Sequence, residues 1–293
     1  MTLHVASNPA TDSTAGNIEA DLTYLASDSH INRRFVAPGL EINTGRYETH
    51  RVTIRNARPF QDHFTLDTHG FQLFRSPSAV RDFAAKAEVD EIYGKEVEAL
   101  IRSVTGATGV VLLGGAVRTA DAYEGGPTQA PAAEVHVDFY PRGTEERLKA
   151  AYDQHFPGGA GFKRAFACSV WRAFSPPPQN MPLALCDGTS VREGDDGMPN
   201  RFIRVDKMPD ENARMGEWPG EEKLISASVF QYDPAHRWWY FPDMIRDEVL
   251  IIKFYDSDLT RAWRCPHTAF RLPEHLKANI RRSIEFRALA YFE

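Results

Sequence analysis

The sequence contains few cysteines, no long basic cluster and no long apolar run. Its 293 residues include three cysteines, Cys168, Cys186 and Cys265. Their odd number and wide spacing indicate neither a disulfide framework nor a CxxC zinc motif. The formal net charge is −6, and no basic cluster exceeds two residues, which argues against nucleic acid or an anionic membrane as a partner. No apolar run approaches the ~18 residues of a membrane-spanning helix.

The N-terminus lacks the basic start and apolar core of a signal peptide. Residues 1–17 are rich in Ser, Thr, Asn and Ala, which predicts a flexible leader. Hydrophobic residues make up 42% and charged residues 25% of the chain, values that are ordinary for a folded protein. We therefore expect a reduced, soluble, cytoplasmic protein in which residues 18–293 form a single domain with an N-terminal helical and strand extension.

The residue pattern predicts an α+β protein whose core is a β-sandwich or barrel, with helices packed on one sheet. Apolar residues at three- and four-residue steps predict helix over 79–105, capped by Ser76 or Ser78 and closed by Gly106. A second, shorter helix is expected at 143–156, and the Gly-, Asp- and Pro-rich segment 192–221 is expected to be a loop that acts as a lid. Strands are expected at 46–56, 70–75, 108–113, 132–139, 164–174, 183–191, 224–232, 248–256 and 281–292.

One strand, within EVHVDFY at 134–140, carries two polar groups two residues apart in an otherwise apolar run. Because strand side chains alternate between faces, His136 and Asp138 point the same way. An imidazole and a carboxylate so placed can occupy adjacent sites on one metal, and a second His would complete the two-His-one-carboxylate face of non-haem Fe(II) oxygenases. HxD alone is a weak signal, since a chance surface or turn pair gives the same pattern.

The C-terminal third offers the missing groups. His267 follows an apolar strand and a turn, and Arg281 and Ser283 come later on the last strand. The arginine fork suits a cosubstrate carboxylate, and the R-x-S spacing puts a hydroxyl beside it. Arg281, Ser283, Glu285 and Arg287 share one strand face, and Arg282, Ile284, Phe286 and Ala288 share the other. An exposed amphipathic edge strand would give the same alternation.

His236 is the rival third ligand, because Arg246 lies ten residues downstream of it. However, His236 precedes the apolar strand rather than following it. Its neighbours in HRWWYF are aromatic residues that are more typical of a core than of a metal site. The order of the elements therefore favours His267 over His236.

Taken together, motifs over about three quarters of the chain resemble the hydroxylase/desaturase family of specialised metabolism. This family includes AsaB-type hydroxylases, a gibberellin desaturase, a meroterpenoid endoperoxide-forming oxygenase and a cephem 7-methoxylation component. It lies within the Fe(II)/2-oxoglutarate-dependent dioxygenase superfamily. The motifs are THGFQL at 68–73, TGA at 105–107, VHVD at 135–138, VWRAF at 170–174, PLALCDGTSV at 182–191, HRWWYFPDM at 236–244, DEVLIIKFYDSD at 247–258, PHTAF at 266–270 and RRSIEFRALAYF at 281–292.

The resemblance implies a double-stranded β-helix (jelly-roll, cupin-like) core that uses Fe(II), 2-oxoglutarate and O₂. An Fe(IV)=O species would abstract hydrogen from a small, specialised-metabolite substrate and so hydroxylate, desaturate or rearrange it. Carried onto this chain, the motifs give His136, Asp138 and His267 as metal ligands, Arg281 and Ser283 as cosubstrate anchors, and Arg287 as the fallback anchor. Arg172 and Lys253 lie in the matching motifs, but the resemblance gives them no role.

Two other classes of function remain open at the level of sequence. The chain could be a non-redox, metal-binding accessory component of a partner enzyme, as the cephem system suggests. It could also be a structural or small-molecule-binding sandwich in which HxD is incidental. The sequence does not indicate an oligomeric state; a homodimer is the candidate assembly only because it is the commonest oligomer.

Overall fold

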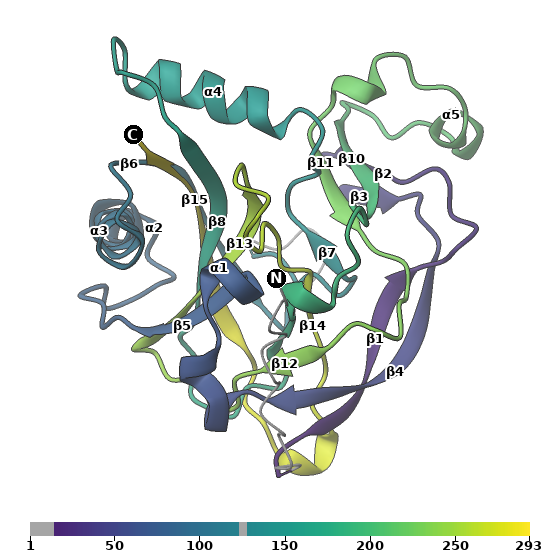
Figure 1. Cartoon of the computed structure of the whole chain (residues 1–293). Helices are drawn as coiled ribbons and strands as arrows, with labels where there is room; N and C mark the ends of the chain where they lie inside the picture. Colours follow the sequence, from purple (N-terminus) through teal and green to yellow (C-terminus); the bar gives the residue numbers. More distant parts are fainter. Residues whose placement is uncertain (1–14, 123–127) are drawn as a thin grey trace, which may run out of the picture.

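The structure is a computed structural model that describes residues 15–122 and 128–293. Most of the predicted leader, residues 1–14, lies outside the described residues. Two sheets face each other across the molecule (Figure 1). The described residues form a ten-stranded sheet in the order β1-β4-β12-β9-β14-β7-β11-β10-β2-β3 and a five-stranded sheet in the order β5-β13-β8-β15-β6. A sheet-rich molecule with few helices matches the α+β prediction.

The five-stranded sheet consists mostly of long antiparallel strands. Its central strand, β8, is buried over nearly its whole length, which explains its run of apolar and small residues. Along β15, Ile284, Phe286 and Ala288 face the outer hydrophobic cluster, as the alternation predicted. The strands of this sheet are β5 (Phe71–Arg75), β6 (Gly109–Thr119), β8 (Arg164–Ala173), β13 (Glu248–Asp256) and β15 (Arg282–Phe292).

The ten-stranded sheet combines short central strands with a longer N-terminal pair. Its central β9-β14-β7 strands face the five-stranded sheet and line the core between the sheets. The strands are β1 (Ile18–Leu25), β2 (Arg33–Ala37), β3 (Leu40–Asn43), β4 (Tyr47–Asn56), β7 (His136–Val137), β9 (Leu183–Cys186), β10 (Met198–Arg204), β11 (Ser226–Val229), β12 (Trp238–Tyr240) and β14 (His267–Ala269).

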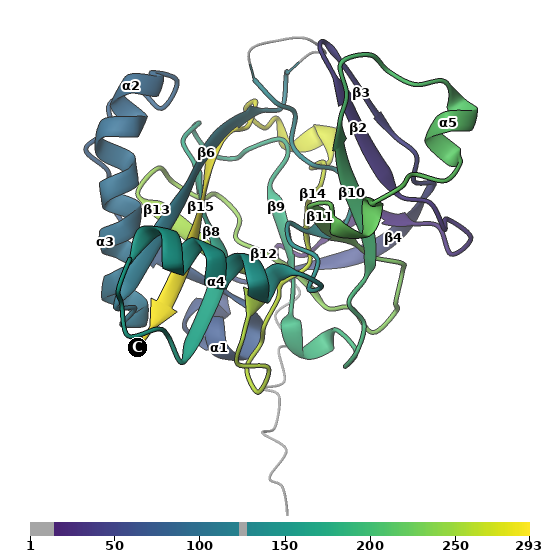
Figure 2. The same cartoon turned by 90° about the horizontal axis from the view of Figure 1, so that it is seen from above.

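Helices cover the five-stranded sheet. Figure 2 shows α2 and α3 on its outer side, away from the ten-stranded sheet, with α4 across one end of the molecule. The α-helices are α1 (Leu66–His69), α2 (Lys86–Glu88), α3 (Gly94–Thr105), α4 (Thr144–His155) and α5 (Glu211–Met215); a π-helical turn (Val89–Tyr93) joins α2 to α3. Four 3-10 turns lie at Arg58–His63, Gly188–Ser190, Glu221–Lys223 and Glu274–Leu276. Within the described ranges, no helix is both long and apolar enough to cross a membrane.

The first predicted helix is confirmed at its end but not at its start. Gly106 closes it in the left-handed conformation, with φ of 74°. Its first turn begins at Lys86 rather than near residue 79, and Ala85 precedes it without a side-chain cap. The Ser78 hydroxyl instead donates to Glu96, 2.6 Å away. That contact ties the irregular segment before the helix to α3.

The prediction that 192–221 is one long loop is wrong. This segment contains β10, which pairs with β11 and with β2, and the short helix α5. Three predicted strands also proved shorter: 132–139 reduces to β7, 224–232 reduces to β11, and 183–191 ends at Cys186 before a 3-10 turn. The N-terminal strands β1, β2 and β3 were not predicted. Their partners are distant in sequence, so local pattern alone could not identify them.

Candidate metal centre

His136, Asp138 and His267 converge between the two sheets. His136 lies on β7, and His267 opens β14 directly opposite it in the antiparallel register. Asp138 follows β7. Their ligand atoms all lie within 4.8 Å of one another, and the two imidazole centroids are 4.5 Å apart. Strands from distant parts of the chain therefore bring together the three residues that the sequence singled out.

Backbone carbonyls orient both imidazoles. The His136 Nδ1 lies 2.8 Å from the Glu134 carbonyl oxygen, and the His267 Nδ1 lies 3.0 Å from the Cys265 carbonyl oxygen. A carbonyl can only accept, so each Nδ1 carries the hydrogen and donates it. Each Nε2 then turns toward the shared centre. This arrangement, in which the second nitrogen is fixed by an outer hydrogen bond, is typical of metal-binding histidines.

Burial and neighbouring charges favour an ionised Asp138 and an unprotonated His267. For His136, burial alone would lower the pKa, but the Asp138 carboxylate raises it. Burial alone would raise the pKa of Asp138, but Arg287 and His136 hold it well below its usual range. The Arg287 Nε lies 2.6 Å from Asp138 Oδ2, while Asp138 Oδ1 lies 3.3 Å from His136 Nε2. Burial, followed by repulsion from His136, lowers the pKa of His267 to about 4. Two imidazole nitrogens and one carboxylate fit a non-haem Fe(II) ion.

Beside the centre lies a narrow cavity of about 30 Å³, lined by both histidines and by Arg281. Among the described residues, the buried polar atoms without a hydrogen-bond partner include Arg281 Nε, Ser283 Oγ and Ser169 Oγ. Arg281 donates one bond, of 2.8 Å, to the Met181 carbonyl. Burial, followed by the nearby Arg118 charge, lowers its pKa to about 9. A buried cation beside unpartnered donors is suited to receive an anionic ligand.

Arg287, the fallback anchor, faces a different group. It does not line the narrow cavity; its guanidinium bridges Asp138 and Glu285, with Nη2 2.8 Å from Glu285 Oε1. Glu285 in turn accepts from Arg118 Nη2 at 2.9 Å. A chain of alternating charges therefore runs from Asp138 to β6. The sequence placed Glu285 and Arg287 on the inward face but gave no signal for this pairing.

Ser169 was missed by the sequence reasoning. It lies on β8 among inward-facing residues that alternate with outward apolar ones, and Arg287 is its register partner on β15. The one available signal was its polarity at an inward position, flanked by Ala167 and Trp171. From sequence alone, Ser169 cannot be distinguished from a serine that simply packs in the core.

His236 is not brought to the metal centre. Its ring stacks on Tyr24 with centroids 5.9 Å apart, and its Nδ1 lies 3.3 Å from the Tyr24 hydroxyl. Arg246, its proposed companion, instead donates to the Val80 carbonyl oxygen. Among the described residues, the group with metal-binding geometry contains His267 and not His236.

A second, larger cavity adjoins the first. Its volume is about 610 Å³, and it shares Arg118 and Ala132 with the narrow cavity. The β2–β3 hairpin and residues 128–134 form much of its wall, which mixes apolar side chains such as Val36 and Leu40 with polar ones.

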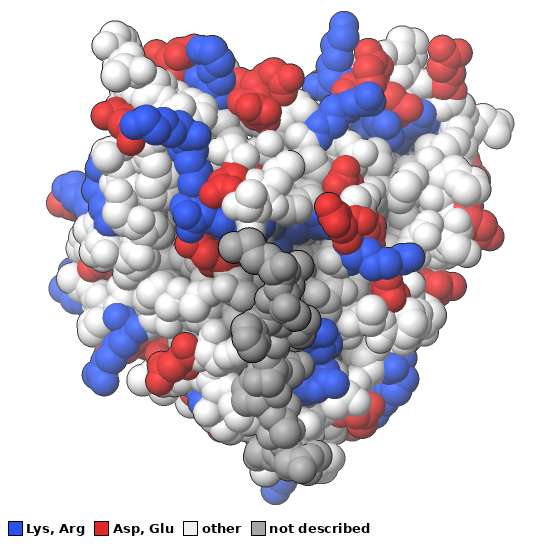
Figure 3. All heavy atoms as spheres, in the orientation of Figure 1, with Lys and Arg blue, Asp and Glu red and all other residues white. Residues whose placement is uncertain are grey.

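On the face drawn in Figure 3, acidic and basic side chains are interspersed rather than gathered into a basic surface.

Comparisons with known proteins agree over most of the chain. The family model YDMC, described as an Oxidoreductase/YMDC permease-like domain, matches residues 22–291. The hydroxylase/desaturase efuI of Hormonema carpetanum is 33% identical over 85% of this chain and 85% of its own length. The Fe(II)/2-oxoglutarate-dependent dioxygenase nvfI of Aspergillus novofumigatus is 32% identical, covering 87% of each chain.

A solved structure extends the likeness to the fold. The iron and alpha-ketoglutarate-dependent endoperoxidase NvfI superposes with a TM-score of 0.76 and 26% sequence identity. The superposition covers 94% of this chain and 98% of that one. Similarity in sequence and in structure therefore extends across nearly the whole length, including the strands that carry the three candidate ligands.

Proposed function

The chain belongs to this family of hydroxylase/desaturases and Fe(II)/2-oxoglutarate-dependent dioxygenases, and on that premise we propose that it is a non-haem oxygenase. It would use Fe(II), 2-oxoglutarate and O₂ to hydroxylate, desaturate or rearrange a small-molecule, specialised-metabolite substrate. The observation that carries this proposal is the convergence of His136, Asp138 and His267, with both Nε2 atoms turned inward.

The proposed metal ligands are these three side chains. When bound, Fe(II) would supply the redox chemistry that couples decarboxylation of 2-oxoglutarate to oxidation of a substrate C–H bond. The Glu134 and Cys265 carbonyls hold the imidazoles in the required orientation. Arg287 holds the Asp138 carboxylate through Oδ2 and leaves Oδ1 beside His136. We assign Arg287 to this positioning role rather than to the cosubstrate.

Arg281 is the proposed partner of the distal 2-oxoglutarate carboxylate, with Ser283 and Ser169 donating beside it. Support comes from the three unpartnered polar atoms, which are costly to bury unless a ligand satisfies them. The cavity that Arg281 and Ser169 line holds only about 30 Å³. The cosubstrate would therefore have to displace lining side chains, among which Arg118 and Glu285 form an ion pair of 2.9 Å.

The proposed architecture is a jelly-roll formed by one domain over residues 18–293. Its support is the pair of facing sheets, the placement of β7, β14 and β15 around the centre, and the structural likeness to NvfI. The larger cavity is the proposed substrate site, because it shares Arg118 and Ala132 with the narrow one. Its mixed apolar and polar wall suits a small amphiphilic molecule.

The test is turnover of 2-oxoglutarate itself, which needs no known substrate. Purified protein with Fe(II), O₂ and 2-oxoglutarate should form succinate and CO₂ slowly, and His267→Ala should not. His236→Ala, a control on the rival histidine, should retain succinate formation. Iron retained by the wild type without any decarboxylation would favour the non-redox accessory role instead.

A further inference from the structure

The backbone just before His267 fixes the orientation of its imidazole. The Cys265 carbonyl oxygen lies 3.0 Å from His267 Nδ1. The N–H of the same residue donates to the Lys253 carbonyl at 3.0 Å. Cys265 is fully buried, and its thiol donates to the Cys186 carbonyl at 3.3 Å. Contacts that fix the position of Lys253 and Cys265 therefore also determine where His267 Nε2 points.

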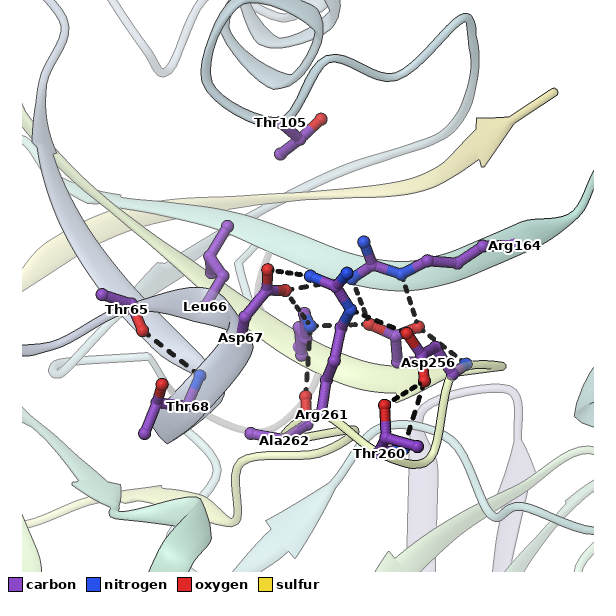
Figure 4. Close-up of polar contacts among 12 residues, drawn as sticks. Thr65, Leu66, Asp67, Thr68, Thr105, Arg164, Asp256, Thr260, Arg261 and Ala262 are labelled. Atoms are coloured by element: carbon purple, nitrogen blue, oxygen red, sulfur yellow. Dashed lines mark hydrogen bonds and ion pairs between the residues drawn. The ribbon is translucent and has the colours of Figure 1, made fainter. Parts of the chain in front are cut away.

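Lys253 is fully buried. Its side chain also contacts the segment before His267, in addition to the backbone contact with Cys265. Its ammonium donates to Asp256 Oδ2 at 2.6 Å, to Asp67 Oδ1 at 3.1 Å and to the Ala262 carbonyl at 3.1 Å. The Ala262 N–H donates back to the Asp67 carbonyl at 2.7 Å. Figure 4 shows Asp67, Asp256 and Ala262 converging from α1, β13 and the turn that follows β13.

The rest of this ionic cluster does not depend on Lys253. Arg164 binds Asp256 through two hydrogen bonds, of 3.0 and 2.6 Å, and also reaches Asp67 at 3.0 Å. Arg261 pairs with Asp67 as well. Both acidic residues would therefore keep a cation if Lys253 lost its charge, so neither carboxylate would be left wholly unpaired.

Gly70 supports the same segment from the other side. Its φ of +82° is a left-handed conformation that favours glycine. A Cβ at this position would lie 2.7 Å from the Arg264 carbonyl oxygen and 3.2 Å from Cys265 Cβ. The Gly70 carbonyl also accepts the Lys253 N–H at 2.8 Å. A side chain at this position would push the 264–265 segment that leads into His267.

From these contacts we infer that Lys253 and Gly70 are positioning residues for the metal ligand His267. The Lys253 side chain acts through its ammonium, which binds the Ala262 carbonyl, whereas its backbone carbonyl would accept the Cys265 N–H from any residue at this position. Gly70 acts by leaving room for Arg264. The inference rests on the proposed function, because it takes His267 as a ligand. It gives a reason for the THGFQL and DEVLIIKFYDSD motifs, neither of which contains a ligand.

The test compares Lys253→Met with Arg172→Met. Arg172 is an equally buried cation on the same sheet, but it donates to the Ser76 carbonyl at 2.7 Å and to the Tyr93 hydroxyl at 3.2 Å, away from the 262–266 segment. Fe(II) affinity is measured anaerobically from the visible band of the Fe(II)–2-oxoglutarate complex, together with the melting temperature of each metal-free variant.

Both variants should melt at a lower temperature, but only Lys253→Met should weaken Fe(II) binding, by about tenfold or more. Gly70→Ala, the second variant, should weaken it in the same way. Folded Lys253→Met and Gly70→Ala proteins that bind Fe(II) like the wild type would overturn the inference, and so would an equal loss in Arg172→Met. A wild type that binds no iron would instead overturn the proposed function itself.

Discussion

Replacing Arg281 should separate cosubstrate binding from folding. The guanidinium is almost fully buried and donates one hydrogen bond to a carbonyl, while its Nε has no partner in the described part of the chain. Burial and the Arg118 charge lower its pKa to about 9, so the guanidinium stays protonated at neutral pH but its charge is less stable than in water. Arg281→Met removes the charge and keeps a similar apolar stem.

The magnitude follows from the hydrogen bonds that a carboxylate would receive. A forked pair of bonds to a charged group contributes about 1.5 kcal/mol or more for each bond. The loss of about 3 kcal/mol corresponds to about a 100-fold higher Kd for 2-oxoglutarate. Since the unliganded cation is not paired with a carboxylate, its removal should leave the melting temperature of the cosubstrate-free protein unchanged or higher.

Anaerobic titration of the Fe(II) protein with 2-oxoglutarate measures this Kd, and calorimetry measures the melting temperature. Arg282→Met is the matched control: Arg282 neighbours Arg281 but is exposed on the other face of β15, and its loss should change neither quantity. The reasoning is refuted if Arg281→Met binds 2-oxoglutarate as tightly as the wild type, or if both arginine variants lose affinity equally.

Three further changes have expected outcomes. Arg287→Met leaves the buried Asp138 carboxylate without its cation. Because the arginine is 37% exposed, the metal-free protein should lose only about 1–2 kcal/mol of stability. Thermal melts with saturating Mn(II) should show that the metal restores most of this loss. Ser169→Ala should raise the 2-oxoglutarate Kd about tenfold in the same titration, since one hydrogen bond to a charged group is lost; an unchanged Kd would remove Ser169 from the anchor set. His236→Gln should bind iron normally but resist mild acid better than the wild type. Burial lowers the pKa of His236 below 6.5, so the unfolded chain takes up a proton at higher pH than the folded chain does. Wild-type stability therefore falls as pH drops below about 6.5. Equal urea denaturation midpoints for the two proteins across that range would contradict a lowered His236 pKa.

The sequence predicted elements best where burial sets a regular period. Strand β15 is an example: its two faces were assigned correctly, because one packs on helices and the other faces the space between the sheets. The start of the first helix was misjudged because Ser78 binds Glu96 in tertiary structure instead of capping a first turn. Strand β10 was missed because its polar residues pair with β2, which is distant in the chain.

The candidate ligands could be proposed from sequence, but their supporting contacts could not. HxD spacing and the late histidine identified His136, Asp138 and His267 as candidates, and sheet pairing then put two of them opposite each other. The Arg287–Asp138 contact joins β15 to the residue that follows β7 of the other sheet, so no local pattern records it. The same is true of Lys253, whose ammonium contacts join segments that are separate in the sequence.

Iron stoichiometry under anaerobic conditions tests the central claim most directly. Wild-type protein and His236→Ala should each bind one Fe(II) per chain and develop the visible band on addition of 2-oxoglutarate. His267→Ala and Asp138→Ala should bind little iron and develop no band while remaining folded. Wild-type protein without stoichiometric iron, or a folded His267→Ala protein that binds iron and 2-oxoglutarate normally, would contradict the proposed metal centre.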